Sequence, residues 1–181
     1  VGGVSGGKST ILYSKDAGLT WKMVTNTAIG ILNGVAQTQN AVVAVGLSGI
    51  VRSISGATGW SKITVTGLRA RLNAVTGSGS TFLAVGDSGT IVRSINSGRS
   101  WTVNTRTGTT KALRGVALGA RSLAIAVGDG GTILRSTNSG TSWSVVTKIT
   151  PFPRAILREV TWLSGGNVVV VGDDGTILHS K

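Results

Sequence analysis

Short apolar segments of five or six residues recur along the chain, separated by turn-forming residues. One stretch reads LNAVTG, TFLAVG, TIVRSI and WTVNT, at residues 72–77, 81–86, 90–95 and 101–105. Their Val, Ile and Thr content and their short, turn-bounded lengths are typical of β-strands. Gly-Asp-Ser-Gly between the second and third segments suits a hairpin, because such residues adopt positive φ at little cost.

The same set of segments repeats about every 40 residues. Related sequences are AVGLSGIVRSISGATGW, AVGDSGTIVRSINSGRSW, AVGDGGTILRSTNSGTSW and VVGDDGTILHSK, and VSGGKSTILYSKDAGLTW fits the same frame. Equivalent serines stand at 14, 53, 94, 136 and 180, which gives spacings of 39, 41, 42 and 44 residues. Four antiparallel strands in a period of ~40 residues predict a β-propeller blade. We therefore expect an all-β propeller, a single domain over 1–181 with repeat units at about 1–27, 28–66, 67–107, 108–150 and 151–181.

The strand order bears on how many blades there are and whether they close. The four strands of a blade are lettered A to D from the axis outward. The chain then holds strands C and D of one blade, three full blades, and strands A, B and C of a last blade. This suggests a five-bladed ring with incomplete terminal blades. A four-bladed ring would require the ends to merge and would leave a third strand over. The remaining alternative is an open arrangement that closes against another chain through its exposed strand edges.

The repeat explains an apparent nucleotide-binding motif at the start of the chain. Gly2, Gly7, Lys8 and Ser9 satisfy the G-x-x-x-x-G-K-[ST] pattern. A phosphate-binding loop follows a buried strand and opens a helix, whereas here only Val1 precedes it and turn residues follow. Gly-Lys-Ser occupies the place of Gly-Asp-Ser-Gly-Thr in the other repeats. VVVVGDD near the end looks like a Walker B strand with its acid, but it is also a repeat unit. We therefore expect Lys8 in a strand-connecting hairpin.

A second motif follows each equivalent serine. Residues 14–21, SKDAGLTW, match S-x-D-x-G-x-[ST]-W, and residues 94–101 and 136–143 match with Asn in place of Asp. In residues 53–60, Ser55, Ala57 and Gly59 replace Asp, Gly and Thr. The expected role is structural: the Asp or Asn side chain bonds backbone N–H groups of the turn, Gly permits a left-handed residue, and Trp packs between blades. The motif residues are Ser14, Asp16, Gly18, Trp21, Trp60, Ser94, Asn96, Gly98, Trp101, Ser136, Asn138, Gly140 and Trp143.

These residues resemble the Asp-box of BNR-type β-propellers. With the A-V-G-D-x-G-T-I-[VL]-R-S unit before the box, the chain most resembles the photosystem II stability/assembly factor type of repeat. The resemblance covers nearly the whole chain. It implies a propeller, and it implies a non-catalytic assembly factor, but Asp-boxes occur equally in sialidases, lectins and sorting receptors, so fold does not fix function.

Composition and charge narrow the class of protein. The chain has 28 Gly, 2 Pro and 40% hydrophobic residues, a folded composition. There is no Cys, which excludes disulfides and thiolate metal sites, and no apolar run approaches the length of a membrane span. The first residue is Val rather than Met, which is consistent with removal of a leader or a longer N-terminal region. Eighteen Lys and Arg against six Asp and Glu give a formal charge of +12, which favours an anionic partner. A generic positive surface is the alternative.

The ionisable residues do not form a recognisable catalytic set. A sialidase needs an arginine triad, a Tyr–Glu pair and an acid Asp, but the only Tyr, Tyr13, occupies the repeat position of Arg52, and the only Glu, Glu159, aligns with Gly34. Glycoside hydrolysis needs two carboxylates at a matched separation, and the Asp residues at 87, 129, 173 and 174 occupy equivalent turns. With one His and no Cys, we expect no catalytic site, no metal site and no cofactor.

The candidate binding surface is basic. In a propeller, the D-to-A loops between blades and the B-to-C turns emerge on one face. The partner-binding candidates in these loops are Arg69, Arg71, Lys111, Arg114, Arg154 and Arg158. Arg114 and Arg158 align with Asn33 and Asn73, at the mouth of the central channel. We expect Arg71, Arg114, Arg154 and Arg158 to be exposed on one face and free of buried ion pairs. The third-strand series Arg52, Arg93 and Arg135 is expected to pack along the sheets or to bond neighbouring blades.

Several partner classes fit a basic propeller. We expect a scaffold that docks an acidic protein surface. Alternatives are a structural component of a larger assembly such as a virion, homo-oligomerisation through the unfinished end blades, and a lectin-like glycan-binding module. Nucleic acid is disfavoured because the basic loops lack interleaved aromatic residues. An exported compartment (thylakoid lumen, periplasm or extracellular space) or a virion is the favoured location.

Overall fold

The computed structural model describes residues 2–5, 8–26, 30–47, 49–55, 58–104, 106–149 and 154–180. Gly7 of the apparent phosphate loop, Ala57 of the degraded box and Thr105 of a predicted strand lie outside these residues.

Five antiparallel sheets follow one another along the chain, and we call them blades 1 to 5. Blade 1 contains β1 (Gly2–Ser5), β2 (Lys8–Tyr13) and β3 (Lys22–Asn26). Blade 2 contains β4 (Leu32–Gln37), β5 (Val42–Gly46), β6 (Gly49–Ser53) and β7 (Ser61–Ile63). Blade 3 contains β8 (Leu72–Ser78), β9 (Thr81–Gly86), β10 (Ile91–Ser94) and β11 (Thr102–Asn104). Blade 4 contains β12 (Leu113–Leu118), β13 (Ala124–Gly128), β14 (Ile133–Ser136) and β15 (Ser144–Val145). Blade 5 contains β16 (Leu157–Trp162), β17 (Val168–Gly172) and β18 (Ile177–His179).

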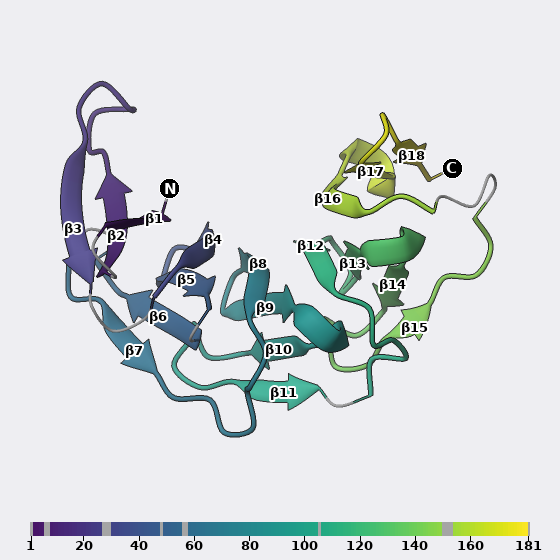
Figure 1. The fold of residues 1–181 in the computed structure, drawn as a ribbon, viewed down its shortest axis with the longest axis horizontal. Helices are drawn as coiled ribbons and strands as arrows, with labels where there is room; N and C mark the ends of the chain where they lie inside the picture. Colours follow the sequence, from purple (N-terminus) through teal and green to yellow (C-terminus); the bar gives the residue numbers. More distant parts are fainter. Residues whose placement is uncertain are drawn as a thin grey trace.

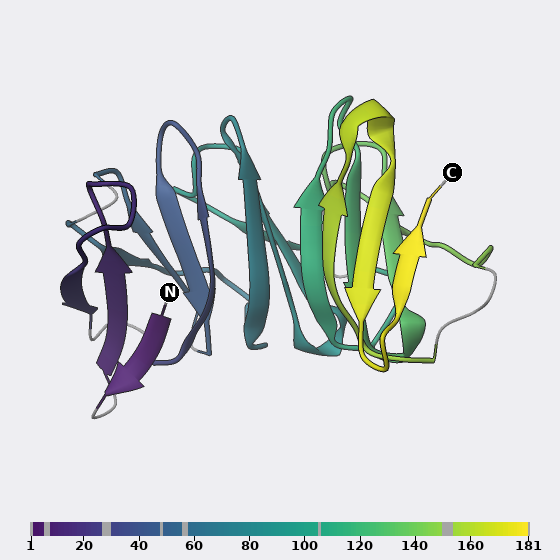
Figure 2. The same ribbon diagram turned by 90° about the horizontal axis from the view of Figure 1, so that it is seen from above.

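The blades form an open arc rather than a ring (Figures 1 and 2). The innermost strands β4, β8, β12 and β16 line the concave side, and blades 1 and 5 lie at opposite ends with a gap between them. Strands pair only within each blade, so no strand pairing joins the two ends among the described residues. The structure has five blades, as the repeat suggests, but the expected ring does not close. The open arc agrees with the shape of the remaining alternative, and its closure against another chain stays a prediction.

Blade 1 differs from the sequence prediction. A strand, β1, precedes the expected C and D strands and pairs with β2 through Ser5 and Lys8. Its sequence, GGVS, has one apolar residue, so the periodicity could not reveal it. Lys8 is the first residue of β2, in a hairpin and not at a helix N-terminus, which confirms the reading against a phosphate-binding loop. In blade 3, by contrast, all four predicted strands are present.

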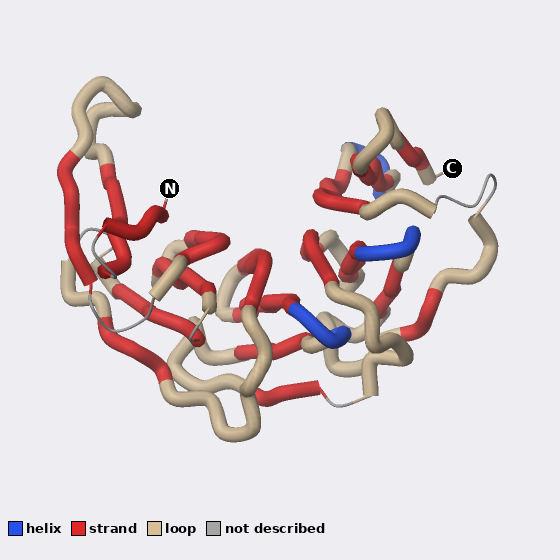
Figure 3. The backbone as a smooth tube through the Cα atoms, in the orientation of Figure 1, coloured by secondary structure: helices blue, strands red, loops and turns tan. Residues whose placement is uncertain are grey.

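The hairpins between second and third strands use the predicted turn chemistry. Ser88 and Gly89 both have positive φ, 55° and 67°, and Thr90 donates its backbone N–H to the carbonyl of Asp87. These turns include the short 3₁₀ segments η1 (Asp87–Gly89) and η2 (Asp129–Gly131), and a third, η3 (Ser164–Gly166), lies in blade 5 (Figure 3). None of the helices in the described residues is long or apolar enough to cross a membrane.

The hydrophobic core lies between blades. One cluster joins Val43, Val45 and Ile50 of blade 2 to Phe82 and Trp101 of blade 3. A second joins blades 3 and 4, and a third joins blades 4 and 5. Each inner blade therefore buries one face against the blade before it and the other against the blade after it, and among the described residues an end blade is covered on one face only.

Candidate functional site

The D-to-A loops and the B-to-C turns meet on one face of the arc, which we call the mouth face. The backbone N–H of Asp87 donates to the carbonyl of Arg71 at 3.0 Å, and that of Asp129 donates to Ala112 at 2.9 Å. The approach is so close that a Cβ at Gly86 would collide with the carbonyl oxygen of Arg71. The A-to-B turns meet the Ser-to-Trp turns on the other face, where Ser97 N–H donates to Ser80. The sequence prediction that the two loop types share one face is confirmed.

A β-bulge aims one side chain of each innermost strand into the mouth. The strand register shifts between Leu32 and Gly34 in blade 2, and the equivalent shifts occur in blades 3, 4 and 5. Bulges re-aim side chains. The residues at the shift are Asn33, Asn73, Arg114 and Arg158, the set that alignment of the repeats had placed at the channel mouth.

The two asparagines of this set bond neighbouring blades. Asn33 Nδ2 donates to the carbonyl of Leu72 at 2.7 Å, and Asn73 Nδ2 donates to that of Leu113 at 2.9 Å. Arg71 donates from Nη2 to Asn33 Oδ1 at 2.9 Å, so it reaches from its loop across to the preceding blade. These contacts hold successive inner strands in register around the mouth.

The two arginines bond within their own blade instead. Arg114 Nε and Nη2 donate to both carboxylate oxygens of Asp129 at 2.8 and 2.9 Å, and Arg158 makes the same fork to Asp173. The Arg114 hydrogen bond lowers the pKa of Asp129, aided by the charges of Arg158 and Lys111, and that bond also raises the pKa of Arg114. The Asp173 hydrogen bond raises the pKa of Arg158.

These pairs change the picture drawn from the sequence. We expected both arginines to be free of buried ion pairs because acids are scarce. The pairs are half-exposed rather than buried, with side-chain exposures of 34% and 28% in the first and 58% and 33% in the second, yet each neutralises a cation of the predicted surface. The physical reason is local: the bulge points position 114 or 158 at the turn aspartate of the same blade, so the few acids sit where these arginines can use them.

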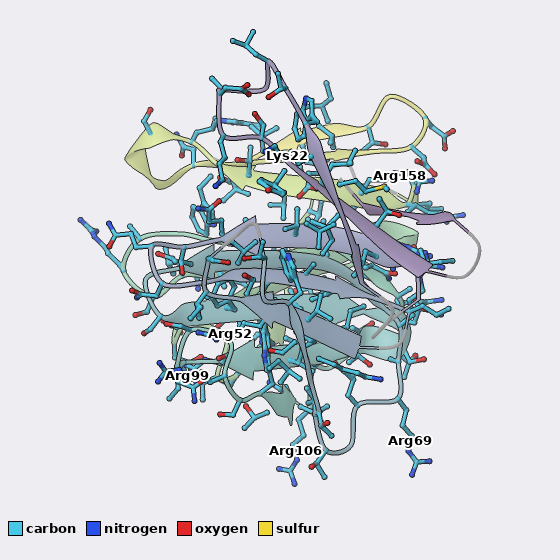
Figure 4. The ribbon with its side chains drawn as sticks, turned by 90° about the vertical axis from the view of Figure 1, so that its left-hand side faces the viewer. Lys22, Arg52, Arg69, Arg99, Arg106 and Arg158 are labelled. Carbon is cyan, nitrogen blue, oxygen red and sulfur yellow. The ribbon has the colours of Figure 1, made fainter. Side chains whose placement is uncertain are left out.

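The other candidate cations carry their charge unpaired. Arg69, Arg71, Lys111 and Arg154 are exposed, and no ion pair involves them within the described chain. Figure 4 shows Arg69 and Arg158 toward one side of the molecule and Arg52 and Arg99 toward the opposite side, with Arg69 and Arg106 both at the outer rim. Free positive charge on the mouth face therefore comes from the loops and not from the inner strands.

The Ser-to-Trp turns, residues 14–21, 94–101 and 136–143, share one hydrogen-bond pattern. In the last of them, Ser136 Oγ accepts from Gly140 N–H at 2.9 Å, and Asn138 Oδ1 accepts from Ser142 N–H at 2.9 Å. Trp143 Nε1 donates to the carbonyl of Gly140 at 3.1 Å, and Gly140 has a φ of +80°. The predicted roles of the Asp or Asn and of Gly are confirmed. The sequence did not indicate that the serine accepts the glycine N–H or that the indole closes the turn.

The tryptophans of these turns differ in burial. Trp101 and Trp143 are 8% exposed, as expected for residues between blades, and are therefore unsuited to stacking on a ligand. Trp60, in the degraded turn, is half-buried, and its indole Nε1 is the one buried side-chain polar atom in the described residues without a partner. Trp21 is 56% exposed, which contradicts the expectation. A buried Trp of these turns packs on the preceding blade, and among the described residues no blade lies before blade 1.

The third-strand arginines follow the same logic. Arg52 Nε donates to the carbonyl of Ser97, and Arg93 Nε donates to that of Ser139 at 2.7 Å, each reaching the Ser-to-Trp turn of the next blade. This confirms the expected bond between neighbouring blades. Arg135, the equivalent residue of blade 4, is exposed and makes no such bond within the described residues.

The residues weighed for catalysis lie far apart in the arc. Tyr13 is in β2 of blade 1 and Glu159 is in β16 of blade 5, at opposite ends of the molecule in Figure 1. Within the described residues, no three His, Cys, Asp or Glu side chains are grouped so that they could hold a metal ion.

Comparison with known proteins gives structural matches only. No protein-family model and no curated protein sequence matches the chain. A structure of YCF48 bound to D1 peptide superposes with a TM-score of 0.73 at 19% identity, over 96% of this chain and 57% of the other. YCF48 from Cyanidioschyzon merolae gives 0.69 at 16% identity, over 97% of this chain and 63% of the other. The GH74 enzyme of Niastella koreensis gives 0.66 at 22% identity, over 96% of this chain and 28% of the other.

This chain thus spans about three fifths of the length of the two YCF48 chains. At identities below 25%, the likeness concerns the fold. Five antiparallel sheets around a common axis, repeating strand order and these superpositions all agree that the chain is a β-propeller, in the form of an open five-bladed arc.

Proposed function

We propose that this chain is a non-catalytic Asp-box propeller that binds an acidic segment of a protein partner through its mouth face. The observation that carries the proposal is the set of exposed, unpaired cations in the D-to-A loops, Arg69, Arg71, Lys111 and Arg154. Arg71 contacts Asn33 at the mouth, where hydrogen bonds join successive blades. A cationic rim on a preorganised scaffold favours fast capture of an anionic chain.

The structural neighbours support a protein partner. One of them, YCF48, is bound to D1 peptide, so the same fold binds a peptide in that protein. The Ser-to-Trp turns support the Asp-box resemblance, because their hydrogen bonds serve the turn and their buried tryptophans serve the core. The separation of Tyr13 and Glu159 across the arc supports a binding role over hydrolysis.

The ion pairs decide which residues the test should change. Arg114 and Arg158 are poor choices, since a glutamate at either site would face its aspartate partner and disturb the fold. Arg71→Glu/Lys111→Glu changes free cations instead. Arg99→Glu/Arg121→Glu is the matched control, with the same change in net charge at exposed sites outside the mouth face.

The probe is a fluorescent ten-residue glutamate-rich peptide, with association followed by stopped flow at increasing salt. We expect the mouth-face double variant to slow association more than about tenfold at low salt, and the control to slow it less than about threefold. Exposed charges contribute little stability, so both variants should fold like the parent. Equal slowing in both variants would show that only net charge matters, and the mouth face would lose its assigned role.

A further inference from the structure

A polar pocket lies between blades 3 and 4, two blades that each have four strands. It has a volume of about 360 Å³, which is in the range of small-molecule sites. Blade 3 contributes residues of β10 and β11 and of the loop that follows, and blade 4 contributes the turn before Trp143. The lining residues include no acid and are Arg93, Thr102, Val103, Asn104, Arg106, Gly140, Thr141 and Ser142.

Several backbone carbonyls around this pocket already accept hydrogen bonds from its walls. Arg93 Nε donates to the carbonyl of Ser139 at 2.7 Å. The hydroxyl of Thr102 donates to the carbonyl of Arg93 at 3.3 Å, and Asn104 Nδ2 donates to that of Thr141 at 3.3 Å. These bonds hold the two blades together at the pocket and occupy three of the acceptors beside it.

Hydrogen-bond donors remain in excess. Arg93 uses only its Nε, so its two terminal nitrogens have no partner among the described residues. Ser142 Oγ accepts from Asn138 Nδ2 at 2.9 Å, which leaves the hydroxyl hydrogen of Ser142 free to donate. Asn104 Nδ2 also keeps a second N–H. A pocket with spare donors, positive charge and no acid suits a ligand that only accepts hydrogen bonds, which is an oxyanion.

Arg106 adds a second cation at the edge of the pocket. Its side chain is exposed at the outer rim of the molecule (Figure 4) and makes no ion pair within the described chain. Its backbone N–H donates to Asn104 Oδ1 at 2.9 Å, which fixes the base of the side chain beside the pocket. Exposed side chains change rotamer rapidly, so this guanidinium can turn inward over a bound anion.

The junction between blades 2 and 3 shows a related arrangement. Arg52, the equivalent of Arg93, donates from Nε to the carbonyl of Ser97 at 2.5 Å, and Arg99 stands where blade 4 has Thr141. Both arginines lie on the same side of the molecule (Figure 4), and the charge of Arg99 adds to burial in lowering the pKa of Arg52. Neither forms an ion pair within the described residues. Neighbouring cations without an acid favour an anion between them.

We infer that the pocket between blades 3 and 4 binds a phosphate or sulfate group, either as the free ion or as the monoester of a small molecule. The terminal nitrogens of Arg93 and the hydroxyl of Ser142 donate to its oxygens, and Arg106 closes over it from the rim. A tetrahedral oxyanion presents acceptors in several directions, which matches donors that come from two blades, whereas a planar carboxylate is matched by one guanidinium fork. The inference uses none of the mouth-face cations and is therefore separate from the proposed function.

Titration of small anions into the full chain labelled with ¹⁵N tests this site. The probes are inorganic phosphate, sulfate and glycerol phosphate at constant ionic strength, with glycerol as the uncharged control, and backbone and arginine Nε–H shifts are followed by NMR. We expect saturable shifts at Arg93, Asn104 and Ser142 with the three anions and none with glycerol. Tighter binding of glycerol phosphate than of inorganic phosphate would identify a monoester as the ligand, and equal or weaker binding would identify the free ion. Either result supports an oxyanion site.

Protein variants locate the site. Arg93→Ala should weaken phosphate binding more than about tenfold, because it removes donors that carry charge. Arg106→Ala should weaken it about threefold. Since the Arg106 side chain makes no hydrogen bond or ion pair in the described chain, this variant keeps the test valid even if Arg93→Ala perturbs the fold. Arg69→Ala removes the same charge from the mouth face and should leave binding unchanged.

Three results would overturn the inference. The first is the absence of a saturable shift at millimolar phosphate. The second is an equal loss of affinity in Arg69→Ala and Arg106→Ala, which would mean that only net charge attracts the anion. The third is a set of shifts spread over the basic loops instead of gathered at the pocket.

Discussion

The interface between blades 3 and 4 and the interface between blades 4 and 5 are built from the same repeat but are completed to different degrees. In the first, Leu83, Val85 and Ile91 pack against Trp143, and Arg93 bonds the turn that carries it. In the second, Ile125, Val127 and Ile133 are aligned in the same way, but within the described residues the position of the tryptophan is a groove and Arg135 makes no such bond.

The comparison teaches that a Ser-to-Trp turn serves the preceding blade as much as its own. Its hydrogen bonds are local, within eight residues, but its tryptophan and its carbonyl are received by the blade before it. Each buried tryptophan of the repeat therefore packs among apolar residues of the preceding blade. Trp21 of blade 1 is exposed, and within the described residues no Ser-to-Trp turn places its tryptophan in the groove between blades 4 and 5.

The largest effect on stability should come from removing a buried tryptophan. Trp143→Ala should lower the free energy of unfolding by about 3–5 kcal/mol, as truncation of a buried aromatic residue does. Trp21→Ala removes a side chain that is 56% exposed and should cost less than about 1 kcal/mol. Urea unfolding of both variants measures the difference. Similar costs for the two would mean that the indole contributes through its own turn and not through the interface.

A smaller loss is expected at the glycine beneath that tryptophan. Gly140→Ala strains a residue with φ +80° and pushes a methyl group into Leu83 of blade 3, so it should cost about 2–3 kcal/mol. Gly130→Ala has φ +63° but open space around it, and should show only the strain, about 1 kcal/mol. Thermal unfolding compares them. If Gly130→Ala proved equally harmful, close contact with the preceding blade would not be the cause.

The third-strand arginines should show the same contrast at lower magnitude. Arg93→Ala loses the hydrogen bond to Ser139 and should cost about 1 kcal/mol. Arg135→Ala loses no such bond and should change stability by less than about 0.5 kcal/mol. Chemical denaturation of the two variants is the measurement. A substantial cost at Arg135 would mean that its aliphatic stem already closes the groove.

The smallest effect concerns Asp16, in the turn that no blade receives. Hydrogen bonds from Thr20 and Ser14 lower its pKa from 3.8 to about 2. Because the folded pKa lies below the unfolded one, the contribution is full above about pH 4 and is lost as the pH falls from 4 to 2. Asp16→Asn, the residue present at 96 and 138, should keep the turn and remove this dependence. Stability curves at pH 2 to 5 for parent and variant test it, and identical slopes would contradict the assigned cause.

Local chemistry was readable from the sequence. The serines at a spacing of about 40, the Val-rich segments and the Gly-Asp-Ser-Gly turns were enough for the propeller, because each strand and hairpin follows from residues within a few positions. The strand Gly2–Ser5 was missed because glycine and serine give no apolar pattern. The ion pairs of Arg114 and Arg158 were missed because a β-bulge sets their direction, and a bulge of one residue leaves no mark in composition.

By itself, the sequence determined the repeat, the strands, the turns and the tryptophans that end the Ser-to-Trp turns. The tertiary structure decided which tryptophans are buried, which cations pair with an aspartate and how the five blades are arranged. The physical reason is the range of the interactions. The hydrogen bonds within the three Ser-to-Trp turns link residues up to four positions apart, whereas burial and ion pairing depend on what the neighbouring blade or the re-aimed strand brings into contact. Turns with the same hydrogen-bond pattern can thus end in a buried Trp143 and an exposed Trp21.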